Sequence, residues 1–214
     1  DPGIDHMSAM KIIDQIKDEG NELVMFKSYT GGLIAPESDN NLWNYKFTWN
    51  PRNVVLAGQG GDAKYIEKNK EVSVSYNDLF KNTESLLIDQ YGKFEAYANR
   101  DSLKYRSIYK LNDIGTIYRG TIRRAGFCNA WNIFVQLGMT DDSYNIGNSN
   151  NMSYREYLNY FFESNSKNSV EANIKQQFNL DEKDIIWQKL LELDIFSDIN
   201  KIPLTNATPA QILE

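Results

Sequence analysis

Arginine side chains gather in YRGTIRR, residues 118–124, beside a threonine and a glycine. Because side chains alternate in direction along a strand, Arg119, Thr121 and Arg123 would share one face. Gly120, on the other face, would let a ligand or another backbone come close. A guanidinium fork beside a hydroxyl suits a carboxylate, which it binds through two parallel hydrogen bonds. The alternative is that these arginines form structural salt bridges with the acidic residues of the chain.

Two further polar groups could contribute to a site. In AYANRDS, Arg100 ends a predicted strand between Asn99 and Asp101. In DPGID, Asp1 and Asp5 stand at the head of a predicted helix. The alternative for DPG is a plain type I turn without a chemical role.

The composition limits the partners of this chain. With 214 residues, 41% of them hydrophobic, the chain is long enough for one good core and a small satellite domain. A net charge of −6 argues against nucleic acid or an anionic membrane as partners. The single cysteine, Cys128, excludes an internal disulfide and favours a reducing compartment. Since neither a membrane-spanning run nor a signal peptide is recognisable, we expect a soluble cytoplasmic protein.

The single histidine, His6, removes several chemistries. A Cys/His metal cluster cannot be assembled, so we predict no metal site, and a Ser-His-Asp triad would need His6 as its base. We expect His6 to pack or cap locally in the first turn of its helix.

The residue pattern predicts a mixed α/β fold with flanking helices. Apolar spacing predicts a helix over 4–19 with Gly20 as its cap, and a buried strand over 22–29 before the turn pair Gly31-Gly32. A short helix begins at Pro51, and a hairpin over 63–74 turns at 68–70. Further strands are predicted over 93–99, 105–111 and 115–123, and a helix over 127–139.

The composition changes near Thr140, where a linker rich in Asn and Ser begins. Helical segments follow over 153–163, 168–178 and 181–193. We place a boundary near 145, between an α/β domain over 1–145 and a helical module over 146–214. Thr208 and Pro209 begin a helix shortly before the last residue, and DPG opens the chain without a preceding element, so we expect both domains to be incomplete.

A glycine-rich stretch resembles a nucleotide-binding loop without its context. Gly58, Gly60 and Ala63 match the G-x-G-x-x-A fingerprint. That fingerprint works only where it joins a strand to a long helix. Here a short helix precedes it and a hairpin follows, which favours an ordinary connection.

Four longer stretches together resemble one family. They are DPGIDHMSAMKIID, SYTGGLIAPESDNNLWNYKFTWNPRNVVLAG, AYANRDS and YRGTIRRAGFCNAW, which in this order resemble the signatures of glutamate-forming saccharopine dehydrogenase (saccharopine reductase). The resemblance covers roughly residues 1–140, and the helical tail matches only in position and character. It implies a substrate-binding and dimerisation domain with a helical insertion, in a homodimer whose N-terminal Rossmann domain is missing here.

The resemblance also implies a reaction. Saccharopine, NAD or NADP and water would give glutamate and 2-aminoadipate 6-semialdehyde, or the reverse, in lysine metabolism. The cofactor would be bound mainly by the missing domain, so the isolated fragment would be inactive. Saccharopine carries three carboxylates around a secondary amine, which fits arginines acting as carboxylate clamps.

Site residues follow from the matched motifs. Arg100 matches the substrate-carboxylate arginine, and Arg119, Gly120 and Thr121 match the segment RGT that lines the substrate pocket. Asp1 matches an acid near substrate and nicotinamide, with a catalytic role in polar positioning or proton transfer around the imine.

Cofactor contacts are implied for Gly3 beside Asp1 and for Phe47 and Trp49 in an aromatic segment. Thr30 would contact substrate, but it stands where many members carry cysteine. Threonine can hydrogen-bond but offers no thiol. The alternatives are a carboxynorspermidine dehydrogenase-type enzyme, which shares the imine chemistry, and a non-catalytic dimerisation or binding module.

Overall fold

The chain folds into two compact units. The structure, a computed structural model, describes residues 3–48, 50–162 and 168–214. The first unit comprises the residues before Leu33 together with Gly58–Ala125, and the second comprises Leu33–Ala57 and Gly126–Glu214. The boundary expected near 145 lies inside the second unit, and the proposed domain division stays a prediction.

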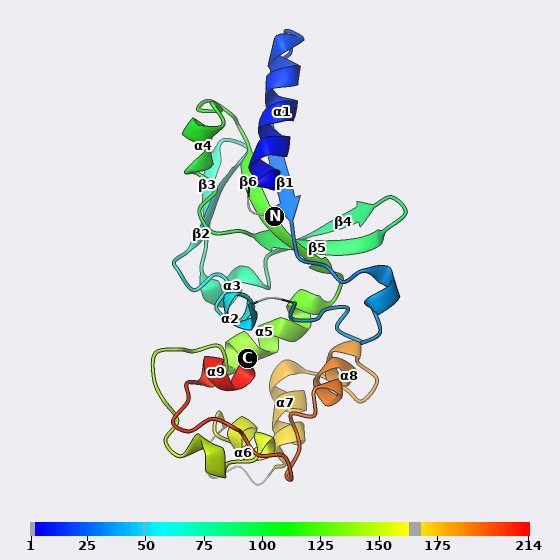
Figure 1. Cartoon of the computed structure of the whole chain (residues 1–214), viewed down its shortest axis with the longest axis vertical. Coiled ribbons are helices and arrows are strands. Elements are labelled where there is room, and N and C mark those ends of the chain that lie inside the picture. The colour runs from blue at the N-terminus through cyan, green and yellow to red at the C-terminus, as the bar shows by residue number, and fades with distance from the viewer. Residues whose placement is uncertain (1–2, 49, 163–167) are drawn as a thin grey trace. The chain divides into compact units, whose positions relative to one another are not determined.

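The first unit is built on a mixed sheet (Figure 1). In the described part of the chain its strands are β1 Phe26–Thr30, β2 Ala63–Glu67, β3 Lys70–Val74, β4 Thr83–Ile88, β5 Gly92–Ala98 and β6 Ile117–Arg124. The order is β3-β2-β6-β5-β4, with antiparallel pairs throughout, and β1 runs parallel to β6. This confirms the mixed α/β class, with β6 at the centre.

The predicted helix is confirmed as α1, Ile4–Asp18, but its apolar positions Ile4 and Met7 are exposed. Its buried Ala9 and Ile13 pack against Tyr109 and Ile117 in the core of the first unit. Figure 1 shows α1 extending from the end of the sheet where β1 and β6 lie. The helix thereby fixes its first turn close to the central strand.

The predicted hairpin over 63–74 and the ordinary glycine connection are both confirmed. Lys68 and Asn69 have φ values of 49° and 65°, as a two-residue turn between twisted strands requires. The loop that begins at Gly58 leads from α2, Pro51–Val55, into β2 rather than into a long helix. The fingerprint therefore has no helix N-terminus to hold a phosphate.

Two sequence predictions were wrong. The expected strand over 105–111 is the helical turn α4, Tyr105–Ile108, since YRSIYKL fits the helical period as well as the strand period. Tyr105 and Tyr109, four residues apart, then face the same way. The expected strand over 22–29 is confined to Phe26–Thr30, where β6 supplies its partner, while Val24 and Met25 are exposed.

The second unit is helical apart from its connecting loops. It contains α2, α5 Phe127–Leu137, α6 Tyr154–Asn159, α7 Val170–Phe178, α8 Ile185–Glu192 and α9 Pro209–Leu213, with 3₁₀ turns at Pro36–Ser38 and Ser149–Asn151. The helices pack as the pairs α5 with α8, α6 with α7, and α2 with α9. All the predicted helices of this unit are confirmed, although most are shorter than expected.

The first unit also contains the short helix α3, Tyr76–Leu79.

Within the part of the chain that the structure describes, no helix combines the length and the apolar character needed to cross a membrane.

The glycine pair after β1 gives a matched test of packing. A side chain at Gly31 would overlap the carbonyl oxygen of Ile122 and come within 3.0 Å of its Cγ1, whereas Gly32 has nothing within 4 Å. Overpacking of this kind costs about 1–3 kcal/mol, so we expect Gly31→Ala to lower the free energy of unfolding by that amount. Gly32→Ala should change it by less than about 1 kcal/mol in either direction. Urea unfolding of both variants checks this, and equal stabilities would contradict the close approach.

Candidate functional site

Arg119 lies in the centre of β6 with its charge already compensated. Its Nη2 donates a hydrogen bond to Asp5 Oδ2 at 2.9 Å, and the side chains are only 12% and 19% exposed. The guanidinium carbon lies 3.9 Å from the centre of the Tyr105 ring, a cation–π contact. The sequence left open that these arginines form structural salt bridges, and such a salt bridge is present at Arg119.

His6 supports this pair from the first turn of α1. Its Nδ1 lies 2.6 Å from the hydroxyl of Tyr109, and its ring is stacked on Tyr105 with centroids 5.1 Å apart. Its Nε2 lies 3.9 Å from Asp5 Oδ2. His6 thus packs, as expected, but against residues about a hundred positions along the chain rather than locally.

The ionisation of Asp5 follows from opposing effects. Burial raises the pKa of Asp5, whereas the hydrogen bond from Arg119 and the charges of His6 and Arg119 lower it, and the net pKa lies below the ordinary 3.8. Burial raises the pKa of the Tyr109 hydroxyl. Near neutral pH the site therefore holds a carboxylate, a guanidinium and a neutral phenol.

The structure brings three of the quoted motifs side by side. Thr30 and Thr121 are register partners in the parallel pair of β1 and β6. The backbone N–H of Asn99 donates to the carbonyl of Arg119 at 2.8 Å, and the N–H of Arg119 donates to Ser102 Oγ at 3.0 Å. Since these residues belong to SYTGG, AYANRDS and YRGTIRR, the motifs meet around Arg119.

The remaining predicted site residues lie in different surroundings. Arg100 follows Asn99 with φ 49° and is exposed. Gly3 precedes α1 with φ 96°, two residues before Asp5. Phe47 belongs to the second unit and is 40% exposed. Asp1 and Trp49 lie outside the described residues.

Gly120 makes room for protein side chains. A Cβ at this position would lie 2.7 Å from the ring of Tyr118 and 3.0 Å from the ring of Tyr29. We expected the missing side chain at Gly120 to leave room for a ligand or another backbone. The structure shows instead that two tyrosine rings fill this space. Its part in a substrate pocket stays a proposal.

Sequence reasoning missed Tyr105, Tyr109 and Ser102, which all contact the Arg119 segment or its partners. The two tyrosines were assigned to a strand, in which they would not flank a helix terminus. Their spacing of four residues was the available signal for a helical turn. The Ser102 contact depends on tertiary structure and left no pattern in the sequence.

The opposite face of the sheet has a separate cavity of about 350 Å³. Tyr118 lines it and, being adjacent to Arg119 in β6, points away from the Arg119 cluster. Lys27 Nζ pairs with Glu84 Oε1 at 2.8 Å, and the Tyr29 hydroxyl donates to Glu84 Oε2 at 2.8 Å. Burial, and next the hydrogen bond to Glu84, raise the pKa of Tyr29. These groups satisfy one another, so we assign the cavity no ligand.

Comparisons with known proteins agree on one family. Residues 1–214 match the family model of the saccharopine dehydrogenase C-terminal domain. The chain is 36% identical over 212 residues, 97% of its length, to saccharopine dehydrogenase [NADP(+), L-glutamate-forming] of Saccharomyces cerevisiae, and covers 47% of that protein. It is 41% identical over 140 residues to mitochondrial alpha-aminoadipic semialdehyde synthase of Rattus norvegicus, covering 65% of this chain and 15% of that one.

A solved structure of similar fold is the apo, histidine-tagged saccharopine dehydrogenase (L-Glu forming) from Saccharomyces cerevisiae. It is 34% identical with a TM-score of 0.82, and the match covers 99% of this chain and 48% of that one. The chain thus spans about half the length of the yeast protein that it matches.

The Asp5–Arg119 pair predicts a pH-dependent stability difference. Because the folded-state pKa of Asp5 is lowered, the pair stabilises the fold above the ordinary pKa of 3.8, and its contribution is lost as the pH falls through the folded-state value. We expect Asp5→Asn to destabilise the chain by about 1–3 kcal/mol at pH 7. The difference from the unsubstituted chain should shrink at pH 3.

Urea unfolding at both pH values measures this difference. Asp14→Asn, at an exposed position of the same helix, is the control and should remain within about 0.5 kcal/mol of the unsubstituted chain. A cost of Asp5→Asn that is the same at pH 3 and pH 7 would rule out the ionic pair as its source.

Proposed function

We propose, from the premise that this chain belongs to the saccharopine dehydrogenase C-terminal domain family, that it supplies the substrate site of a saccharopine dehydrogenase. The intact protein would convert saccharopine, NAD or NADP and water into glutamate and 2-aminoadipate 6-semialdehyde, or the reverse. The observation that carries the proposal is the meeting of three motifs around Arg119. The names of the matched relatives favour saccharopine over carboxynorspermidine as substrate.

Arg119 is suited to hold a substrate carboxylate without giving up Asp5. A guanidinium has five N–H donors, and the bond to Asp5 uses one on Nη2. Among the described residues, Asp5 is the side chain that accepts from this guanidinium, so we propose that its other donors bind a carboxylate, with Thr121 and Thr30 in adjacent strands as hydroxyl partners. Exposed Arg100, one residue after the backbone contact with Arg119, would bind a second carboxylate.

A dinucleotide would supply the hydride acceptor, and this chain would contribute contacts to it. We assign these contacts to Asp1, Gly3, Phe47 and Trp49, and the NADP(+) in the yeast relative's name supports NADP as the cofactor. Asp1 would hold or move a proton at the secondary amine of the substrate. Gly3 precedes the first turn of α1, whose Asp5 contacts Arg119, which supports placing Gly3 beside the substrate.

Steady-state kinetics of the intact protein with saccharopine and NADP(+) test the assignment. Arg119→Lys keeps the charge but loses the fork, so kcat/KM for saccharopine should fall about 10- to 100-fold. Arg124→Gln in the same strand is the control and should stay within about threefold of the unsubstituted protein. Unchanged kinetics of Arg119→Lys would contradict its role in binding a substrate carboxylate. If the unsubstituted protein does not reduce NADP(+) when saccharopine is added, the assignment as a saccharopine dehydrogenase would be wrong.

We also propose a homodimer, supported by apolar side chains on the surface of the first unit. Ile4 and Ile12 of α1 and Met25 before β1 are 55%, 58% and 56% exposed, and all three line one hollow of the first unit. Clustered apolar exposure of this kind marks interaction surfaces. We expect the intact protein to sediment as a dimer and the double variant Ile12→Asp, Met25→Asp to shift toward monomer. A monomeric unsubstituted protein would contradict the dimer, and an unshifted double variant would contradict this surface.

A further inference from the structure

The aromatic segment that contains Phe47 is fixed at both ends by the helices of its own unit. We infer that the helices of the second unit position this segment, residues 44–50, for ligand binding, and that Trp43 and Arg52 anchor its two ends. The inference rests on the proposed function, in which Phe47 faces a ligand. The helices of the second unit would then be part of the binding apparatus, although none of them supplies a proposed ligand contact.

The first anchor is Trp43, which is 6% exposed. Its indole Nε1 donates to the carbonyl of Lys189 in α8 at 2.7 Å. Its ring is stacked on Phe134 of α5 with centroids 5.8 Å apart. The preceding residue, Leu42, donates its N–H to the Glu192 carboxylate at 2.8 Å, and its carbonyl accepts from Lys189 Nζ. The chain is therefore tied to both α5 and α8 just before the aromatic segment.

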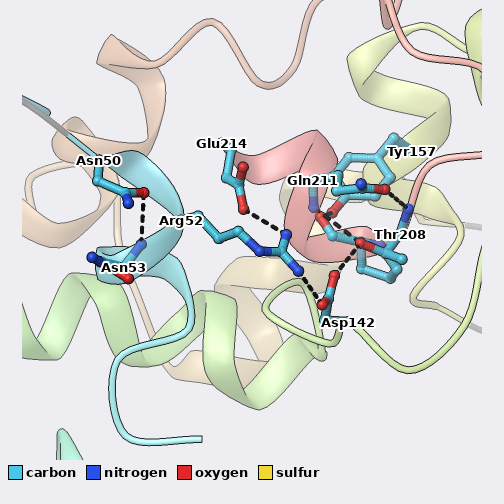
Figure 2. Close-up of polar contacts among 9 residues, drawn as sticks. Asn50, Arg52, Asn53, Asp142, Tyr157, Thr208, Gln211 and Glu214 are labelled. Carbon is cyan, nitrogen blue, oxygen red and sulfur yellow. Dashed lines mark hydrogen bonds and ion pairs between the residues drawn. The ribbon is translucent and has the colours of Figure 1, made fainter.

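The second anchor is Arg52 in α2, which lies between two carboxylates (Figure 2). Its Nη2 donates to Asp142 Oδ2, in the loop after α5, and its Nη1 donates to Glu214 Oε1 at 3.1 Å. The start of α2 is set by Asn50, whose side chain accepts from the N–H of Asn53 at 3.3 Å. The cap and the arginine together fix where the aromatic segment ends.

The carboxylate partner Asp142 connects Arg52 to further hydrogen bonds in the second unit. Asp142 accepts a hydrogen bond on its other oxygen from Thr208 Oγ1 at 2.7 Å. Thr208 caps α9 through a reciprocal pair of hydrogen bonds with Gln211, at 2.9 and 3.2 Å. The hydroxyl of Tyr157 in α6 donates to the carbonyl of Pro209 at 2.9 Å, and Figure 2 shows these residues in one connected group. Arg52 is thus joined to a network that spans α2, α6 and α9.

Among the described residues between the anchors, Phe47 is the large ring that stays at the surface. Tyr45 packs edge-on against Phe127 of α5 with centroids 5.1 Å apart. Phe47 packs edge-on against Tyr45 at 5.8 Å and is 40% exposed. A side chain that is oriented by its neighbours but not buried by them is what a ligand contact requires. The anchors hold the backbone, Tyr45 orients Phe47, and the exposed ring is left for a partner molecule.

The second unit contains a closely matched control for Arg52. Arg155 in α6 also contacts two carboxylates, Glu171 at 2.6 Å and Asp198 at 3.0 Å. It ties α6 to α7 and to the loop after α8, and none of these elements adjoins the segment 44–50 in sequence. Arg52→Gln and Arg155→Gln therefore remove comparable ion pairs, of which only the first belongs to an anchor.

The experiment combines hydrogen exchange and kinetics of the intact protein. In Arg52→Gln we expect amide exchange over residues 44–50 to rise about fivefold or more while α7 is unchanged, because opening of the segment becomes easier. We expect KM for NADP(+) to rise about three- to tenfold with a smaller change in kcat, as the loss of a ligand-positioning contact predicts. Arg155→Gln should speed exchange in α7 and leave both the segment and KM unchanged. If Arg52→Gln does not fold, Arg52→Lys, which keeps the charge and loses the fork, takes its place.

The outcomes distinguish a failure of the inference alone from a failure of the proposed function. If the unsubstituted protein is active and the two arginine variants have the same KM and the same exchange over 44–50, the inference is wrong and the function stands. Faster exchange in Arg52→Gln with an unchanged KM also overturns the inference, since the segment would move without effect on the ligand. If the unsubstituted protein reduces no NAD(P)⁺ with saccharopine, the proposed function fails, and the inference fails with it.

Discussion

The ion pair between Arg119 and Asp5 is the contact on which the candidate site depends. A guanidinium that is 12% exposed has lost most of its water, and it is tolerated in the sheet only because a carboxylate and the Tyr105 ring take the place of that water. The same pair joins β6 to the first turn of α1. It therefore sets where the first turn of α1 lies relative to the central strand, and it holds the guanidinium plane in one orientation.

In the second unit, contacts of a different kind hold the segment that contains Phe47. Its segment over 33–57 is separated in sequence from the helices that hold it, which begin with α5. Trp43 is held by burial of a large aromatic surface and one hydrogen bond, whereas Arg52 is held by charge. Burial fixes the backbone closely at one end, and the partly exposed ion pair tolerates small shifts at the other.

Local features were predictable from the sequence because their signals are local. The helix over 4–18, the hairpin over 63–74 and the capped α9 each follow from spacing and cap residues. The stretch 105–111 was misassigned because its apolar positions fit both periods, and only packing against α1 decides between them. The Asp5–Arg119 pair spans 114 residues, so its two ends could be named as candidates but not joined. The motif order linked them through family resemblance, not through physics.

A structural salt bridge and a ligand-binding arginine are not exclusive at position 119. If Arg119 were unpaired in the absence of ligand, its burial would cost several kcal/mol, and the fork would rotate toward any available acceptor. With Asp5 in place, the guanidinium is oriented before a ligand arrives, and less side-chain entropy is lost on binding. An exposed arginine at position 100 has the opposite character, since it is well solvated and unconstrained by burial. One fixed and one exposed cation suit a ligand with several carboxylates, because the first sets the register and the second adapts to it.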